Sequence, residues 1–132
     1  MRMKYIHILF FILAALFIWY SYNASNSLKD NQILTIGTIE YFQGGGRANA
    51  GRTVINGTYS INGIRRNVSS VLFKSQIIGQ NPEKYFIGKK FPVIYEKGSP
   101  NHCIFLITPK HFAIYNRPFP DSLRWVLKYL KN

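Results

Sequence analysis

Residues 46–53, Gly-Arg-Ala-Asn-Ala-Gly-Arg-Thr, nearly match the phosphate-binding loop of nucleotide hydrolases, in which four residues separate two glycines. That loop needs a lysine to reach the terminal phosphate and a following helix whose amino end faces the anion. Here Arg52 replaces the lysine, and the residues after Thr53 are typical of a strand. We therefore expect a glycine-rich connection between two strands, in which Arg47 and Arg52 would at most form a simple anion site.

A thiol enzyme would require an imidazole beside the sulfur of Cys103, the only cysteine in the chain. Strand alternation points His102 and Cys103 to opposite faces, and the apolar residues around Cys103 are typical of a core strand. His111 is the one histidine that a hairpin would bring towards this thiol. A Cys103-dependent enzyme is therefore the third hypothesis for function, after two noncatalytic ones.

Other catalytic and metal-binding chemistry is not expected from this sequence. Paired-carboxylate catalysis needs two acids within several ångströms, and the five acidic residues are scattered along the chain. Three histidines and one cysteine at these spacings do not form a zinc ligand set. We therefore expect no catalytic residue, no metal, no cofactor and no small-molecule substrate.

The charge of the chain predicts an anionic partner. Seventeen Lys and Arg stand against five Asp and Glu, which gives a formal net charge of +12. Setting aside Arg2 and Lys4 at the amino end, fifteen basic residues minus five acidic ones leave +10 on the remainder. Acidic protein, nucleic acid and anionic lipid all fit such a charge. The candidate anion-binding or partner-binding residues are Arg47, Arg52, Arg65, Arg66, Lys89 and Lys90.

The amino-terminal residues predict a membrane anchor. Residues 5–22 are almost entirely apolar and would span about 27 Å as a helix, close to the bilayer core of about 30 Å. Basic residues precede this run and aromatic residues close it, which predicts a cytoplasmic segment 1–4 and a domain outside the inner membrane of a bacterium, or in its periplasm. A cleaved signal peptide is the alternative, but cleavage requires small residues at both recognition positions, and only Ala24 is small, with the bulky Tyr22 two positions earlier. Nucleic acid is not an expected partner outside the membrane.

The residues after the anchor predict a small β-domain. Residues 23–32 are polar and are interpreted as a tether, and residues 33–116 as a mainly β-domain, an antiparallel barrel or sandwich. The first strand is expected at 33–42, with Leu34, Ile36, Thr38, Glu40 and Phe42 on one face. Asn62-Gly63 predicts a hairpin turn. Later strands are expected at 91–96, 102–108 and 110–116, after a loop or short helix at 79–90.

The last residues, 117–132, change period and predict a short amphipathic helix. Leu123, Val126, Leu127 and Leu130 would share one face. The opposite face carries Arg124, Lys128 and Lys131, which are candidate membrane-surface residues. The leucines would either lie on the bilayer or pack over an open end of the sheet, and packing is favoured because so short a helix is marginal in water.

Several short motifs resemble a family of small bacterial membrane-anchored proteins classified only as a domain of unknown function. The similarity spans residues 33–108 and is carried by Tyr59, Asn62-Gly63, Gly88-Lys89, Val93-Ile94-Tyr95 and Ser99-Pro100-Asn101. Membership implies an N-terminal span and a tethered β-domain with no established activity.

Together these features favour a single-pass membrane protein whose basic β-domain is a noncatalytic binding or accessory module near the bilayer. Its expected partners are the lipid bilayer and an unidentified protein. The alternative is a membrane-tethered immunity protein that neutralises a toxin through a basic surface matched to an acidic partner.

Overall fold

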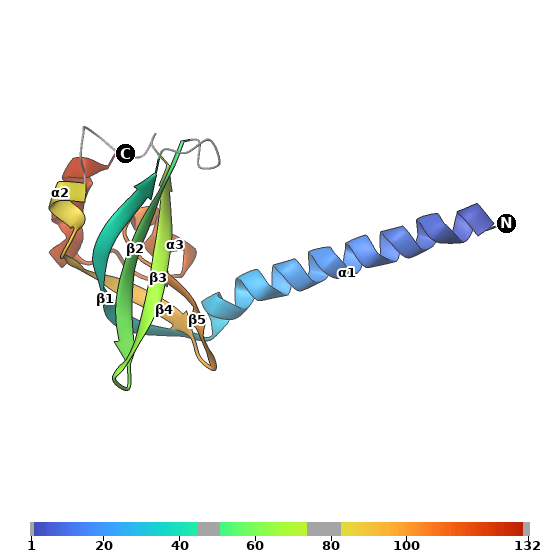
Figure 1. The fold of residues 1–132 in the computed structure, drawn as a ribbon, viewed down its shortest axis with the longest axis horizontal. Helices are drawn as coiled ribbons and strands as arrows, with labels where there is room; N and C mark the ends of the chain where they lie inside the picture. Colours follow the sequence, from blue (N-terminus) through green and yellow to red (C-terminus); the bar gives the residue numbers. More distant parts are fainter. Residues whose placement is uncertain (1, 45–50, 74–82, 131–132) are drawn as a thin grey trace.

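A computed structural model describes residues 2–44, 51–73 and 83–130 of the 132-residue chain. A long amino-terminal helix leads into a small β-barrel, with short helices at one end and side of the barrel (Figure 1). This arrangement confirms the predicted mainly-β domain behind an apolar helix. The elements are α1 (Arg2–Asp30), β1 (Gln32–Gly44), β2 (Arg52–Ile61), β3 (Ile64–Phe73), α2 (Glu83–Phe86), β4 (Lys90–Glu96), β5 (Ser99–Phe105), α3 (Pro109–Ile114) and the 3-10 helix η3 (Asp121–Tyr129).

The five strands form one antiparallel sheet in the order β3-β2-β1-β4-β5. The sheet curls until β3 lies against β5, so the barrel is nearly closed. This order places the long strand β1 at the centre of the sheet, where it is shared between β2 and β4. The architecture alone assigns no ligand, because one fold hosts many functions.

Strand β1 can serve both halves because it bends at a bulge. Its first half pairs with β4 and its second half with β2, and the register shifts between Ile39 and Tyr41. The bulge inserts one residue, so the alternation expected from the sequence reverses beyond it. Phe42 consequently packs against the core, while Tyr41 is 53% exposed. The expected placement of Phe42 on the face of Leu34 and Ile36 is therefore wrong.

The predicted hairpin is confirmed. Asn62 and Gly63 connect β2 to β3 with φ of 51° and 78°, the left-handed backbone that such a two-residue turn requires. The β4–β5 connection is shorter than expected, so β5 begins at Ser99 and includes Pro100. Proline is tolerated there because β5 ends the hydrogen-bonded sheet.

The last predicted strand, 110–116, is wrong, because the chain forms helix α3 there. Thr108 accepts a hydrogen bond from the backbone amide of His111 at 3.1 Å, and Pro109 occupies the first turn, where a missing amide hydrogen costs nothing. Phe112 faces the core on this helix. Capping and proline chemistry at the start thus outweigh the alternating pattern that follows.

The terminal amphipathic helix is present, but it is a 3-10 helix. Three residues per turn place Leu123 and Val126 on one buried face and rotate Leu127 away, so that Leu127 is 37% exposed. Trp125 packs edge-on against Phe86 and Phe91, with ring centroids 5.5 and 5.9 Å apart. The helix therefore closes one end of the barrel, which confirms packing over lipid contact for its apolar side chains.

The apolar helix α1 does not stop at residue 22. It continues through most of the segment 23–32 that the sequence predicted as a tether, and residue 31 is a bend before β1. Tertiary contacts hold this polar extension: Leu28 is buried in the barrel core, and the backbone amide of Lys97 donates to the carbonyl of Asn31 at 2.9 Å. A flexible tether is therefore not what the structure shows between anchor and barrel.

Gln32 ties this junction together. Its side-chain amide donates to the carbonyls of Lys29 and Tyr115, at 2.9 and 3.0 Å. Its side-chain oxygen accepts from Nε of Arg117 at 2.5 Å. One side chain therefore joins the end of α1, the start of β1 and the chain after α3, and fixes how α1 leaves the barrel.

Candidate functional site

The most distinctive exposed surface is the outer face of β1 and β4. Alternation and register place three cross-strand pairs there, Leu34 with Ile94, Ile36 with Pro92, and Thr38 with Lys90. Ile94 is fully buried, whereas Leu34 is 48% and Ile36 63% exposed. Apolar side chains thus continue from the core out onto the surface, although an exposed strand face ordinarily carries polar residues.

We name Leu34, Ile36 and Pro92 the apolar patch. One hollow of about 500 Å³ lies over it, lined also by Thr35. A second hollow, of about 250 Å³, adjoins the first, since Leu34 and Pro92 line both. The far wall of the second hollow comes from α3, the segment that follows it and the start of η3, namely Phe112, Arg117, Pro118, Pro120 and Ser122. Together they form a shallow apolar groove beside the barrel.

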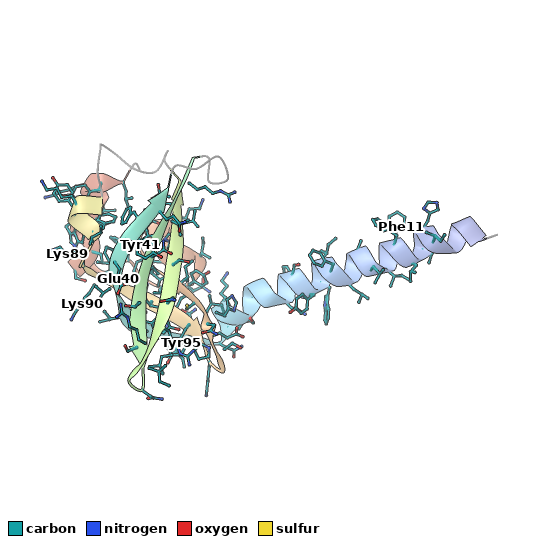
Figure 2. All side chains as sticks on the ribbon, viewed as in Figure 1. Phe11, Glu40, Tyr41, Lys89, Lys90 and Tyr95 are labelled. Atoms are coloured by element: carbon teal, nitrogen blue, oxygen red, sulfur yellow. The ribbon has the colours of Figure 1, made fainter. Side chains whose placement is uncertain are left out.

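Two lysines border this patch. Lys90 lies two residues before Pro92, on the same outer face of β4, and Lys89 immediately precedes Lys90 in the chain. The backbone at Lys89 is fixed, because its carbonyl accepts from the amide of Ile39 at 3.1 Å and the amide of Gly88 donates to the carbonyl of Ile39 at 2.8 Å. Figure 2 shows both lysines with Glu40 and Tyr41 on the side of the barrel away from α1. Within residues 2–44, 51–73 and 83–130, neither lysine forms an ion pair.

The other predicted anion-binding residues that the structure describes do not join these lysines. Arg47 lies outside the described residues, and Arg52 is exposed at the start of β2. Arg65 pairs with Glu40, which also accepts a hydrogen bond from Thr58 at 3.0 Å. Arg65 is therefore already engaged by a carboxylate, and Lys89 and Lys90 are the predicted residues that lie together at the apolar patch in the described part of the chain.

Arg66 lies on the opposite face of β3, at the mouth of the barrel. Its Nη1 donates to the side-chain oxygen of Asn101 at 3.1 Å, which bridges the seam between β3 and β5. The rings of Tyr59 and Tyr95 stack beside it, 5.7 Å apart, and the Tyr59 hydroxyl donates to the carbonyl of Pro100. Burial raises the pKa of Tyr59 well above its ordinary value. This cluster closes the barrel, and Arg66 is a seam residue within it.

The predicted membrane-surface residues lie on η3. Arg124 is exposed and pairs with Asp121 at 2.9 Å, Lys128 is exposed, and Lys131 lies outside the described residues. In Figure 1 this helix, coloured red, lies on the side of the barrel opposite α1. The arrangement does not bring Arg124 and Lys128 towards the bilayer that α1 would enter.

The thiol of Cys103 has no imidazole beside it. Its sulfur lies 3.4 Å from the carbonyl oxygen of Asn67 and 3.6 Å from that of Asn101, and burial raises its pKa, which disfavours the thiolate. His102 points away and pairs with Glu96 at 2.7 Å, a hydrogen bond that lowers the pKa of this carboxyl. The geometry gives nucleophilic catalysis no support.

His111 has a structural role instead. Its Nδ1 accepts from the backbone amides of Ile107 and Thr108, at 3.3 and 3.4 Å, which requires an unprotonated ring nitrogen. Burial lowers its pKa in agreement with that role.

The apolar patch was missed at the level of the sequence, although a signal was present. Leu34 and Ile36 share the expected face of the first strand with the polar Thr38 and Glu40, so this face is not cleanly polar. Nothing in the sequence paired that face with Pro92 and Lys90, because this pairing depends on the register between β1 and β4.

No protein-family model, no curated protein and no solved structure matches this chain. The resemblance to a bacterial membrane-anchored family therefore stays a prediction. Among the residues that the structure describes, one helix, Ile6–Asp30, is long and apolar enough to cross a membrane, and no side chain of its apolar window is buried.

Proposed function

We propose that this protein is a membrane-anchored, noncatalytic binding module that holds its basic barrel at a fixed orientation outside the membrane. The observation that carries the proposal is the exposed apolar helix α1, joined to the barrel through Leu28 and Gln32. An apolar helix with no protein covering it is unstable in water and stable in a bilayer. The described part of the barrel presents a groove and two lysines without ion pairs, which are features of a binding surface.

The anchor is tested by fractionating cells that express the full chain. We expect the protein to sediment with membranes, to resist an alkaline wash and to be extracted only by detergent. The barrel should be cleaved by protease added outside once the outer barrier is opened. Recovery of a shortened product in the soluble fraction would refute the anchor, since it would mean that the apolar helix is removed as a signal peptide.

The binding function is tested in the same cells with a photo-crosslinking amino acid. It would replace, one at a time, exposed residues on different faces of the barrel: Ile36, Tyr41, Asn67 and Lys128. We expect a reproducible protein adduct from at least one position. An absence of adducts from every position would refute a protein-binding module.

An immunity protein is the second candidate, favoured by the combination of an anchor with a net charge of +12. An acidic toxin would be attracted to such a surface before it crossed the membrane. A gene for a large secreted toxin next to this one, and death of cells that carry the toxin without this protein, would support that role. A neighbourhood of cell-envelope genes would count against it.

A further inference from the structure

We propose that the apolar patch and its two lysines form a docking site for one kind of ligand: a polypeptide segment of a partner protein in which apolar residues adjoin carboxylates. This inference rests on the proposed function, that the barrel is a binding module, and names the chemistry of its partner. The site consists of Leu34, Ile36 and Pro92, with Lys89 and Lys90 at its edge.

The apolar half of the segment is inferred from the shape and exposure of the groove. Two adjoining hollows of about 500 and 250 Å³ lie over half-exposed aliphatic side chains. Sites of a few hundred cubic ångströms accept groups the size of large side chains. Filling them would remove Leu34 and Ile36 from water, the kind of buried anchor that dominates binding free energy at interfaces.

The acidic half of the segment is inferred from charge complementarity. Lys90 stands next to Pro92 on the outer face of β4, directly opposite Thr38 of β1. The nearest carboxylate on β1, Glu40, is already held by Arg65 and Thr58, which leaves the lysines without a partner among the described residues. A carboxylate on the docked segment would supply that partner.

The position of the patch argues against the bilayer as its occupant. Residues 23–30 extend α1 by about 12 Å beyond the apolar segment. From there β1 sweeps to the side of the barrel away from α1, where Figure 2 shows Lys89 and Lys90 (Figure 1). The Gln32 junction fixes this direction, so the lysine edge of the site lies across the barrel from α1 and from any headgroups that would surround it.

A second copy of the chain fits the patch less well than an acidic partner. A twofold dimer built on the patch would bring together two chains that each carry a net charge of +12. Like charges repel each other, whereas an acidic segment would be attracted to this surface.

The test uses the full chain in uncharged detergent micelles and three panels of fluorescent peptides. The first panel has four apolar residues, varied among Leu, Ile, Val and Phe, followed by three acidic residues. The second panel replaces the acidic residues with lysine, and the third replaces the apolar residues with serine. We expect measurable binding, by fluorescence anisotropy, only for the first panel, and a loss of affinity as salt is raised.

Variants then locate the binding. Ile36→Asn and Lys90→Glu should each weaken binding about tenfold or more, as expected for anchor residues of an interface. Both positions are exposed, so the fold should be retained, and thermal unfolding checks this. The matched controls are Val71→Ser, which changes a 40% exposed residue on the outer face of β3, and Lys128→Glu on η3. Both controls should bind like the parent protein.

Four results would overturn the inference. Three concern the peptides: no binding by the first panel, equal binding by the lysine panel, or an equal loss of affinity in the control variants. The fourth is binding of the protein to both anionic and neutral lipid vesicles that Ile36→Asn abolishes. Sedimentation that shows a dimer abolished by Ile36→Asn would assign the patch to a second copy and also overturn it. The crosslinking experiment separates the two proposals. Adducts at Asn67 but not at Ile36 would leave the binding module standing and remove this site.

Discussion

The barrel depends on the absence of a side chain at Gly57, and replacing this residue with alanine should destabilise the protein strongly. Gly57 lies in β2, paired with Ile39 of β1 and facing the barrel interior. A Cβ atom there would overlap the carbonyl oxygen of Thr38 and approach Cζ of Phe105 to 2.8 Å. The first obstacle is backbone, so no change of rotamer can relieve it.

The size of the effect follows from these contacts. Overpacking a core usually costs about 1–3 kcal/mol, and a backbone clash belongs at the upper end or beyond it. Alanine recovers about 0.4–1 kcal/mol by restricting the unfolded chain. We therefore expect a net loss of about 2–3 kcal/mol, a large share of the roughly 5–15 kcal/mol that stabilises a typical domain.

Gly44→Ala is the matched control within the same sheet. A Cβ atom at Gly44 would meet Oγ1 of Thr53 at 3.4 Å and the carbonyl oxygen of Arg52 at 3.6 Å, which are ordinary contacts. This variant should match the parent protein or exceed its stability by up to about 1 kcal/mol. The contrast between the two glycines isolates close approach from the general effect of alanine.

The assay is urea unfolding of the full chain in detergent micelles, followed by the fluorescence of Trp125. The chain has two tryptophans, so a Trp19→Phe background leaves Trp125 as the only one. Trp125 reports on the barrel because it packs on Phe86 and Phe91. Equal unfolding free energies for the Gly57 and Gly44 variants would refute the reasoning. Full recovery of the Gly57 variant by Phe105→Leu would show that the ring, and not the backbone, sets the cost.

Three further predictions follow from single side chains. Gln32→Ala should lower the unfolding free energy by about 2 kcal/mol and speed protease cleavage near the end of α1, because three hydrogen bonds are lost. Gln43→Ala, at an exposed position on the same strand, should change neither quantity. Unchanged cleavage of the Gln32 variant would contradict a rigid junction. His111 has a lowered pKa in the folded protein, so stability should fall as pH drops below the ordinary histidine value of about 6.5, and His111→Gln should remove that part of a pH-dependent urea titration. Cys103 should react slowly with iodoacetamide at neutral pH and rapidly once urea unfolds the barrel, and a fast reaction of the folded protein would contradict its half-buried position.

Much of the architecture could be predicted from local patterns. The apolar run and its aromatic end predicted α1, and Asn62-Gly63 predicted the turn between β2 and β3 because few residues adopt its backbone. The sequence failed where tertiary structure overrides local pattern. Residues 110–116 alternate like a strand, yet Thr108 and Pro109 start a helix whose Phe112 completes the core.

The candidate site could be predicted only in part, because it is made by register. Lys89 and Lys90 are conspicuous as a basic pair in the sequence, but Arg65 and Arg66 are equally conspicuous and turn out to be engaged on opposite faces of β3. The charge of the sequence predicts an anionic partner, but it does not show which cations remain unpaired after folding. Only the pairing of Ile36 with Pro92 reveals an apolar surface beside two unpaired lysines.

The junction between α1 and the barrel decides how this surface can be used. A flexible tether would let the barrel turn any face towards the bilayer, and a basic barrel would then settle on anionic lipid. Instead, Leu28 is buried in the core and Gln32 bonds three segments, so the barrel is held at one orientation. In the membrane-anchored module that we propose, Lys89 and Lys90 would then lie across the barrel from the bilayer, where an approaching protein would meet them with little competition from lipid. A rigid anchor of this kind lowers the orientational cost of binding, since the surface is already presented to its partner.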